Sequence, residues 1–86
     1  MTIKKQLVKR VIADDVILVP VGDASLELKG LMMLNETGEL LWDALPAVNN
    51  EEELVSALQK EYEVDAETAA ADVSDFLNML RTLGII

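Results

Sequence analysis

The side chains with the clearest capacity for chemistry are carboxylates that stand next to one another. They are the pair Asp14-Asp15 and the run of glutamates at residues 51–53. Two carboxylates can share general acid–base work when a cleft shifts the pKa of one of them. The glutamate run lacks the spaced oxygen ligands and central glycine of a calcium loop. Both groups stand where turn or helix-start chemistry explains them, so the sequence predicts no catalytic or calcium role.

The other residue types of the chain also argue against catalysis and metal binding. The chain has no cysteine and no histidine, and its four glycines stand singly. Disulfides, thiolate or imidazole metal sites and iron–sulfur clusters therefore have no ligands here, and no Gly-rich phosphate loop is present. We expect no enzymatic activity, no metal and no cofactor, which leaves binding as the default role.

Length and hydropathy predict one small domain. The 86 residues, of which 51% are hydrophobic, suffice for one core over residues 1–86. No apolar run approaches the ~20 residues of a membrane span. The basic start, residues 1–10, lacks the apolar segment and cleavage site of a signal peptide. We expect a cytoplasmic protein without membrane contact.

Charge is divided unevenly along the chain. Residues 1–35 carry five Lys/Arg and four Asp/Glu, whereas residues 36–86 carry two Lys/Arg against twelve Asp/Glu. An acidic half of this kind repels phosphate backbones. A DNA-reading role for the last helix is disfavoured, because its exposed positions include Glu67, Asp72 and Asp75 with Arg81 as the only base.

Three strands are predicted in the first half. Residues 6–12 contain β-branched side chains, and residues 16–19 form a continuous apolar run that suggests two covered faces or one face offered to a partner. Asp14 supplies turn chemistry between them. Residues 25–34 form a third strand region, which alternates over residues 25–29 and is interrupted by Gly30.

Three helices are predicted in the second half. Asn35, Asn50 and Asp65 stand where helix N-caps are expected, and Glu53 completes a capping-box pattern with Asn50. The third helix, residues 66–83, has an apolar stripe at spacings of three and four. Gly84 suits a left-handed stop. The order β-β-β-α-α-α predicts a winged-helix-like α+β domain, with a three-stranded antiparallel sheet followed by three helices.

Several blocks of the sequence resemble one known family. Residues 34–38, Leu-Asn-Glu-Thr-Gly, are followed four residues later by Trp42. Residues 62–65, residues 72–77 and the ending at residues 83–86 follow in order. Together they are similar to the PqqD-like family, the RiPP recognition elements that act as peptide chaperones in ribosomal peptide modification. The resemblance covers roughly residues 16–86.

The resemblance implies a function and a site. Family members bind the leader of a precursor peptide along the third strand, beside the third helix, and present it to a modifying enzyme that is commonly a radical S-adenosylmethionine maturase. The implied partners are thus a leader peptide and that enzyme. Carried onto this chain, the peptide-binding residues are Lys29, Leu31, Met32, Met33, Leu34, Val73, Phe76, Leu80 and Leu83.

Strand addition suits such a site on physical grounds, because an exposed sheet edge offers unpaired N–H and C=O groups to an extended peptide. For each of the four helix residues in that set, a core role competes with a groove role. The alternative function is an acidic protein–protein interaction or assembly module of the same fold. An obligate homodimer that buries the third strand's edge would favour this alternative.

Overall fold

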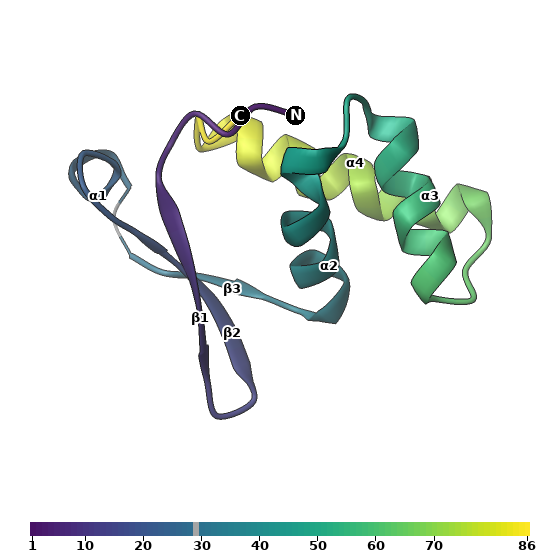
Figure 1. Cartoon of the computed structure of the whole chain (residues 1–86), viewed down its shortest axis with the longest axis horizontal. Helices are drawn as coiled ribbons and strands as arrows, with labels where there is room; N and C mark the ends of the chain where they lie inside the picture. Colours follow the sequence, from purple (N-terminus) through teal and green to yellow (C-terminus); the bar gives the residue numbers. More distant parts are fainter. Residues whose placement is uncertain (29) are drawn as a thin grey trace.

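The computed structural model describes residues 1–28 and 30–86. An antiparallel sheet lies at one end of the molecule and a group of helices at the other (Figure 1). The elements follow the order β1 (Leu7–Ile12), β2 (Asp15–Pro20), α1 (Ala24–Glu27), β3 (Met32–Leu34), α2 (Glu36–Ala44), the 3-10 turn η1 (Leu45–Ala47), α3 (Glu51–Glu61) and α4 (Ala66–Thr82).

The predicted fold class is confirmed: a three-stranded antiparallel sheet precedes three main helices. The strands lie in the order β1-β2-β3, so β2 is central. Val16 pairs with Val11 on one side and with Leu34 on the other. This register puts Leu18, Met32 and Leu34 on the face that packs against the helices.

The predicted third strand is wrong in its first half. The chain forms the short helix α1 at residues 24–27, and β3 is limited to residues 32–34. Gly22 turns the chain with a φ of +60°, and its carbonyl accepts from both the backbone N–H and the hydroxyl of Ser25. These local bonds favour a helical turn over the extended chain that the alternation over residues 25–29 suggested. Lys29, part of the predicted strand, lies outside the described residues.

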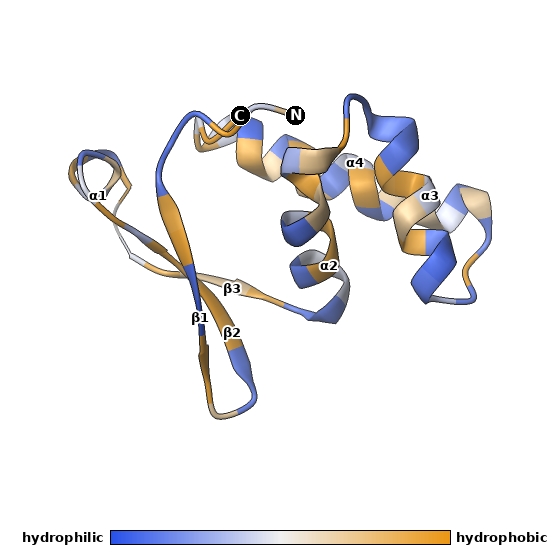
Figure 2. Ribbon diagram, viewed as in Figure 1, coloured by the Kyte–Doolittle hydropathy of each residue, from blue (hydrophilic) through white to orange (hydrophobic). Residues whose placement is uncertain are grey.

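One core joins the sheet to the helices. Leu18 of β2 and Leu34 of β3 are buried together with Leu41 and Trp42 of α2. The helices add further fully buried side chains, namely Leu54, Leu58, Val73, Leu77 and Leu80. Apolar positions of α2, α3 and α4 face this core while their charged positions face outward (Figure 2). The acidic half of the sequence is therefore apolar inside and acidic outside.

The three predicted N-caps are confirmed. The side chains of Asn35, Asn50 and Asp65 accept from backbone N–H groups three residues later, at 2.8, 3.0 and 2.7 Å. The capping box differs in one bond. The carboxylate of Glu53 accepts from the N–H of Asn49, one residue before the cap. These bonds satisfy N–H groups that a helix start leaves without partners.

Asp65 gives the cap of α4 a dependence on pH. Hydrogen bonds from the side chain and backbone N–H of Thr68 lower the pKa of Asp65 from its ordinary value of 3.8. The ionised cap therefore contributes stability above about pH 4, which is lost as pH falls through the folded-state pKa. Asp65→Asn keeps the acceptor but does not titrate. We expect urea unfolding to show a shallower loss of stability below pH 4 for this variant, and equal slopes would contradict the assignment.

The β1–β2 hairpin turns tightly at Ala13, which has a φ of +55°. A side chain with a Cβ is strained at positive φ, whereas glycine is not. We expect Ala13→Gly to raise the free energy of unfolding by roughly 0.5–1 kcal/mol, since relief of strain exceeds the added chain entropy. Urea denaturation measures this difference. Ala47→Gly, at a position with ordinary φ, is the control and should not stabilise.

The end of α4 and the N-terminal segment are tied together. Gly84 has a φ of +71°, and the N–H of Ile85 donates to the carbonyl of Leu80 at 2.9 Å, which confirms the predicted left-handed stop. Ile85 is fully buried, and its carbonyl accepts from the N–H of Lys4. The first residues therefore run beside the C-terminal end of α4 (Figure 1). Among the described helices, none has the length and apolarity to span a bilayer.

Candidate functional site

The strand β3 forms one edge of the sheet. It pairs with β2 through Leu18–Met32, Ile17–Met33 and Val16–Leu34, and it has no strand on its other side in the described part of the chain. No backbone hydrogen bond from residues 31–34 to a group outside the sheet occurs there either. The outer side of β3 therefore presents N–H and C=O groups that an extended peptide can pair with.

Side chains alternate across this edge strand. Leu34 is buried in the core and Met32 is half-buried against it. Met33 lies on the opposite face with 67% of its surface exposed, and Leu31, just before the strand, is 61% exposed. The predicted Met-rich strand end thus supplies a core anchor, a partly open side chain and two exposed ones.

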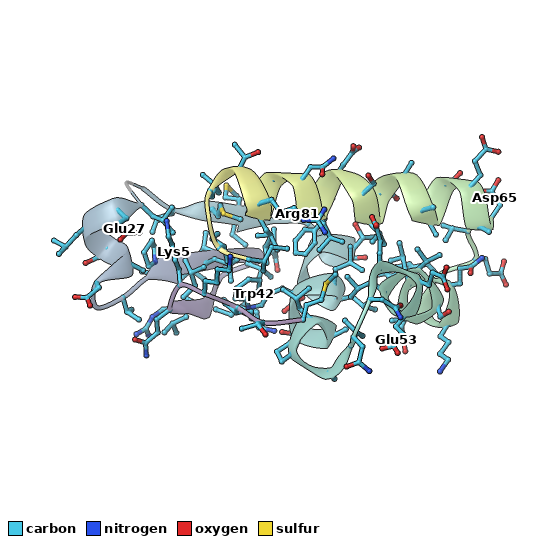
Figure 3. All side chains as sticks on the ribbon, turned by 90° about the horizontal axis from the view of Figure 1, so that it is seen from above. Lys5, Glu27, Trp42, Glu53, Asp65 and Arg81 are labelled. Atoms are coloured by element: carbon cyan, nitrogen blue, oxygen red, sulfur yellow. The ribbon has the colours of Figure 1, made fainter. Side chains whose placement is uncertain are left out.

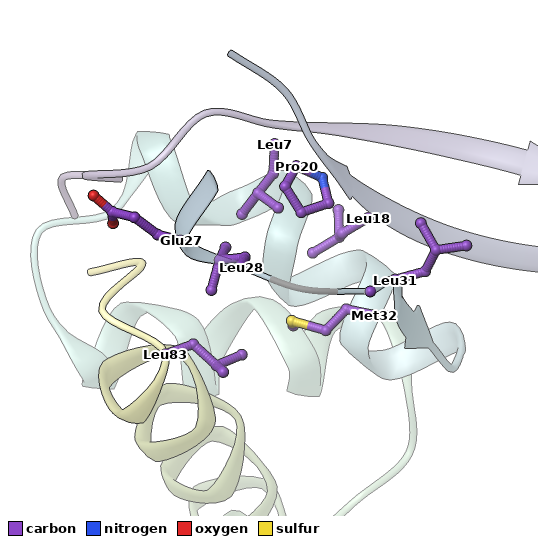
Figure 4. Close-up of a pocket in the computed structure, with 9 residues that line it drawn as sticks. Leu7, Leu18, Pro20, Glu27, Leu28, Leu31, Met32 and Leu83 are labelled. Atoms are coloured by element: carbon purple, nitrogen blue, oxygen red, sulfur yellow. The ribbon is translucent and has the colours of Figure 1, made fainter. Parts of the chain in front are cut away.

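An apolar cavity of about 310 Å³ lies where β3 begins (Figure 4). Side chains from the three strands, from the α1 region and from the end of α4 meet here, and Glu27 is the only charged residue among those described at its wall. The lining comprises Leu7, Leu18, Pro20, Glu27, Leu28, Gly30, Leu31, Met32 and Leu83. We call it the apolar cavity. An aliphatic or aromatic side chain of a ligand would lose water-exposed surface here.

Lys5 fixes the rim of the apolar cavity. Its Nζ contacts the carboxylate of Glu27 at 2.9 Å and donates to the carbonyl oxygen of Leu83, also at 2.9 Å. One ammonium group thus joins the N-terminal segment, α1 and the end of α4 (Figure 3). This contact holds Glu27 and Leu83 on neighbouring parts of the rim.

A second cavity, of about 300 Å³, lies where β3 passes into α2. Its apolar side chains are Leu41, Phe76 and Met79, and the remaining lining residues are Asn35, Thr37, Gly38, Asp72 and Asp75. We call it the acidic cavity. Because β3 and α4 both run from one cavity to the other, we call the two cavities with the free edge between them the β3–α4 groove.

The structure divides the residues that the resemblance singled out. Leu31, Met32 and Leu83 line the apolar cavity, and Phe76 lines the acidic cavity. Leu34 belongs to the core but keeps its backbone on the edge strand, and Met33 points away from the helices. Val73 and Leu80 have no exposed surface, so their side chains belong to the core. Lys29 lies outside the described residues.

Sequence reasoning missed several lining residues. Leu7, Leu18 and Leu28 reach the apolar cavity, and Asp72, Asp75 and Met79 reach the acidic cavity. The helix residues carried a usable signal, since Asp72, Asp75 and Met79 are three or four positions apart and share one face of α4. The strand residues come together only through pairing, which local spacing does not reveal.

Comparison with protein families identifies the chain. Residues 15–86 match the family described as Coenzyme PQQ synthesis protein D (PqqD). The chain belongs to the PqqD family. The matched part begins at β2 and contains all of the β3–α4 groove except the contribution of Leu7. Comparison with curated proteins finds no match.

A solved structure supports this assignment. The PqqD-family chain is similar to TbiB1, whose structure is described as TbiB1 in complex with the TbiA(beta) leader peptide, with 29% sequence identity and a TM-score of 0.74. The similarity covers 99% of this chain and 93% of the TbiB1 chain. The two proteins therefore share the α+β architecture over almost their whole length.

Proposed function

We propose that this PqqD-family protein is a non-catalytic peptide chaperone. It binds the leader of a ribosomally made precursor peptide by adding the leader as a strand to β3, and it presents the precursor to a modifying enzyme. The observation that carries the proposal is the free edge of β3 beside an apolar cavity. The complex of TbiB1 with a leader peptide supports it, because TbiB1 has the same architecture.

The expected binding free energies show why both the free edge of β3 and the apolar cavity are needed. Roughly four backbone hydrogen bonds along β3, at ~0.5–1.5 kcal/mol each, give only about 2–6 kcal/mol before the peptide's ordering cost. Sub-micromolar affinity requires more than about 8 kcal/mol. One or two apolar side chains in the groove, at ~1.5–3 kcal/mol each, supply the difference. We therefore assign backbone pairing to residues 31–34 and anchoring to Leu31, Met32 and Leu83.

The partner enzyme is proposed to be a radical S-adenosylmethionine maturase. A surface remains open for it when β3 is occupied. The sheet face opposite the helices carries Val8, Ile17, Val19 and Met33, and much of the β1–β2 hairpin is apolar (Figure 2). A strand added beside β3 extends this face, so an enzyme that docks there contacts carrier and leader together. Because the added leader strand and this sheet face form one surface, the arrangement favours presentation of the leader to an enzyme over binding of the leader alone.

A backbone NMR titration tests the proposal. The ¹⁵N-labelled chain is titrated with the TbiA(beta) leader and with candidate leaders from short precursor genes beside this chain's own gene. We expect the largest shifts at residues 30–34 and in the segment from Phe76 of α4 to its C-cap Leu83. Shifts confined to other surfaces, or no shifts with any leader at millimolar concentration, would contradict the proposal.

A further inference from the structure

We propose that the acidic cavity makes the protein selective for leaders with a basic side chain four residues before their apolar anchor. This inference rests on the proposed function and names its substrate class. The two ends of the β3–α4 groove differ in their chemistry. One end is lined almost entirely by apolar side chains, whereas the other combines an apolar wall with the carboxylates of Asp72 and Asp75.

The acidic cavity fits a lysine or arginine side chain. Such a side chain has an apolar stem and a charged end, and it prefers to bury the stem while the charge stays near water. Phe76 and Met79 offer the apolar wall, and Met79 is 39% exposed. Asp72 and Asp75 are exposed at the same cavity, one turn apart on α4.

The two aspartates have no cationic partner in residues 1–28 and 30–86. The ion pairs in these ranges join Lys5 to Glu27 and Lys9 to both Glu39 and Asp43. The part of the chain from residue 36 onward also contributes only Lys60 and Arg81 as cations. A basic side chain from a ligand would therefore meet carboxylates that form no ion pair with any cation of these ranges.

Geometry sets the spacing. Leu31 and Asn35, which flank β3, border the two cavities and are four residues apart, or about 13 Å at 3.3 Å per residue. Along α4, Leu83 and Asp75 are eight residues apart, or about 12 Å at 1.5 Å per residue. The strand distance matches the distance to Asp75, whereas Asp72 is eleven residues from Leu83, or about 17 Å at 1.5 Å per residue. An added strand covers the distance to Asp75 in four residues, and an even number keeps both side chains on one face.

Direction follows from strand pairing. β3 runs from the apolar cavity toward the acidic cavity, and antiparallel pairs outnumber parallel ones. An antiparallel leader enters at the acidic cavity, so its basic residue precedes the anchor.

Synthetic peptides test the inference. Each is a capped 12-residue chain of alternating valine and threonine with one leucine anchor, and carries lysine, glutamine or glutamate four positions before the anchor. Further peptides place lysine three positions before or four positions after it. We expect the lysine peptide at four positions before to bind about three- to tenfold more tightly than its glutamine counterpart, the glutamate peptide more weakly, and the difference to shrink at high salt. NMR titration measures these affinities into the millimolar range.

Protein variants supply the control. The double substitution Asp72→Asn and Asp75→Asn should make the lysine and glutamine peptides bind with equal affinity. Glu67→Gln, on the same helix but at neither cavity, should keep the preference for the lysine peptide. Equal binding of lysine, glutamine and glutamate peptides would overturn the charge rule while leaving peptide binding intact. Tighter binding with lysine after the anchor would overturn the direction. Binding of a natural leader without binding of any of these peptides would overturn the charge rule, and failure of the natural leaders as well would contradict the proposed function.

Discussion

Leu31→Asp is expected to weaken leader binding by about 10- to 100-fold while the fold stays intact. Leu31 is exposed in the free protein and lines the apolar cavity, so its replacement costs little stability. Loss of one apolar contact of ~1.5–3 kcal/mol corresponds to this range of affinity. The new carboxylate also stands at the cavity that holds Glu27, next to any apolar anchor. Isothermal titration with the leader that binds the unaltered chain most tightly measures the effect.

Leu26→Asp is the matched control for this prediction. Leu26 is also an exposed leucine, with 79% of its surface accessible, and it lies on α1 but lines neither cavity. We expect its substitution to change leader affinity by less than about twofold. Equal losses in the two variants would mean that general hydrophobicity, and not the apolar cavity, determines binding.

Leu80→Ala is expected to lower the free energy of unfolding by about 2–5 kcal/mol, as for other buried leucines. Leu80 has no exposed surface and packs in the core between the sheet and the helices. Such a loss is a large part of the stability of a small domain. Urea denaturation measures it, and Leu80→Met, which conserves volume, should cost less than about 1.5 kcal/mol.

The same variant separates a core role from a groove role. Under conditions where Leu80→Ala is still folded, its leader affinity should match that of the unaltered chain within about twofold. Leu83→Ala should lose leader affinity and cost less stability than Leu80→Ala, because Leu83 is half-exposed and lines the apolar cavity. A specific loss of leader affinity in folded Leu80→Ala would contradict the assignment of Leu80 to the core.

The helical half was largely predictable because its signals are local. A cap needs only a short polar side chain three residues before the N–H it accepts from, and Asn35, Asn50 and Asp65 meet this condition. The stop at Gly84 is local in the same sense, since only the conformation of one residue is required. The third strand was predicted less well, because the alternation over residues 25–29 is too short to outweigh the turn at Gly22.

The site was predictable only in outline. One apolar stripe runs along α4 to its C-cap and contains Val73, Phe76, Leu80 and Leu83. Periodicity therefore cannot separate the residues that pack in the core from those that line a cavity. The separation depends on how α4 lies against β3, which is a long-range property. The apolar cavity depends likewise on Leu7 and Leu18, which reach it only because β1 and β2 pair in one register.

Amide hydrogen exchange at residues 31–34 tests whether the free edge of β3 accepts a leader peptide as an added strand. In the free protein, N–H groups on the outer side of β3 have no partner in the described part of the chain, so they should exchange quickly. With saturating leader, these outward N–H groups should exchange at least about tenfold more slowly, because each donates to the added strand. Unchanged exchange at residues 31–34, with protection arising elsewhere, would contradict strand addition at β3.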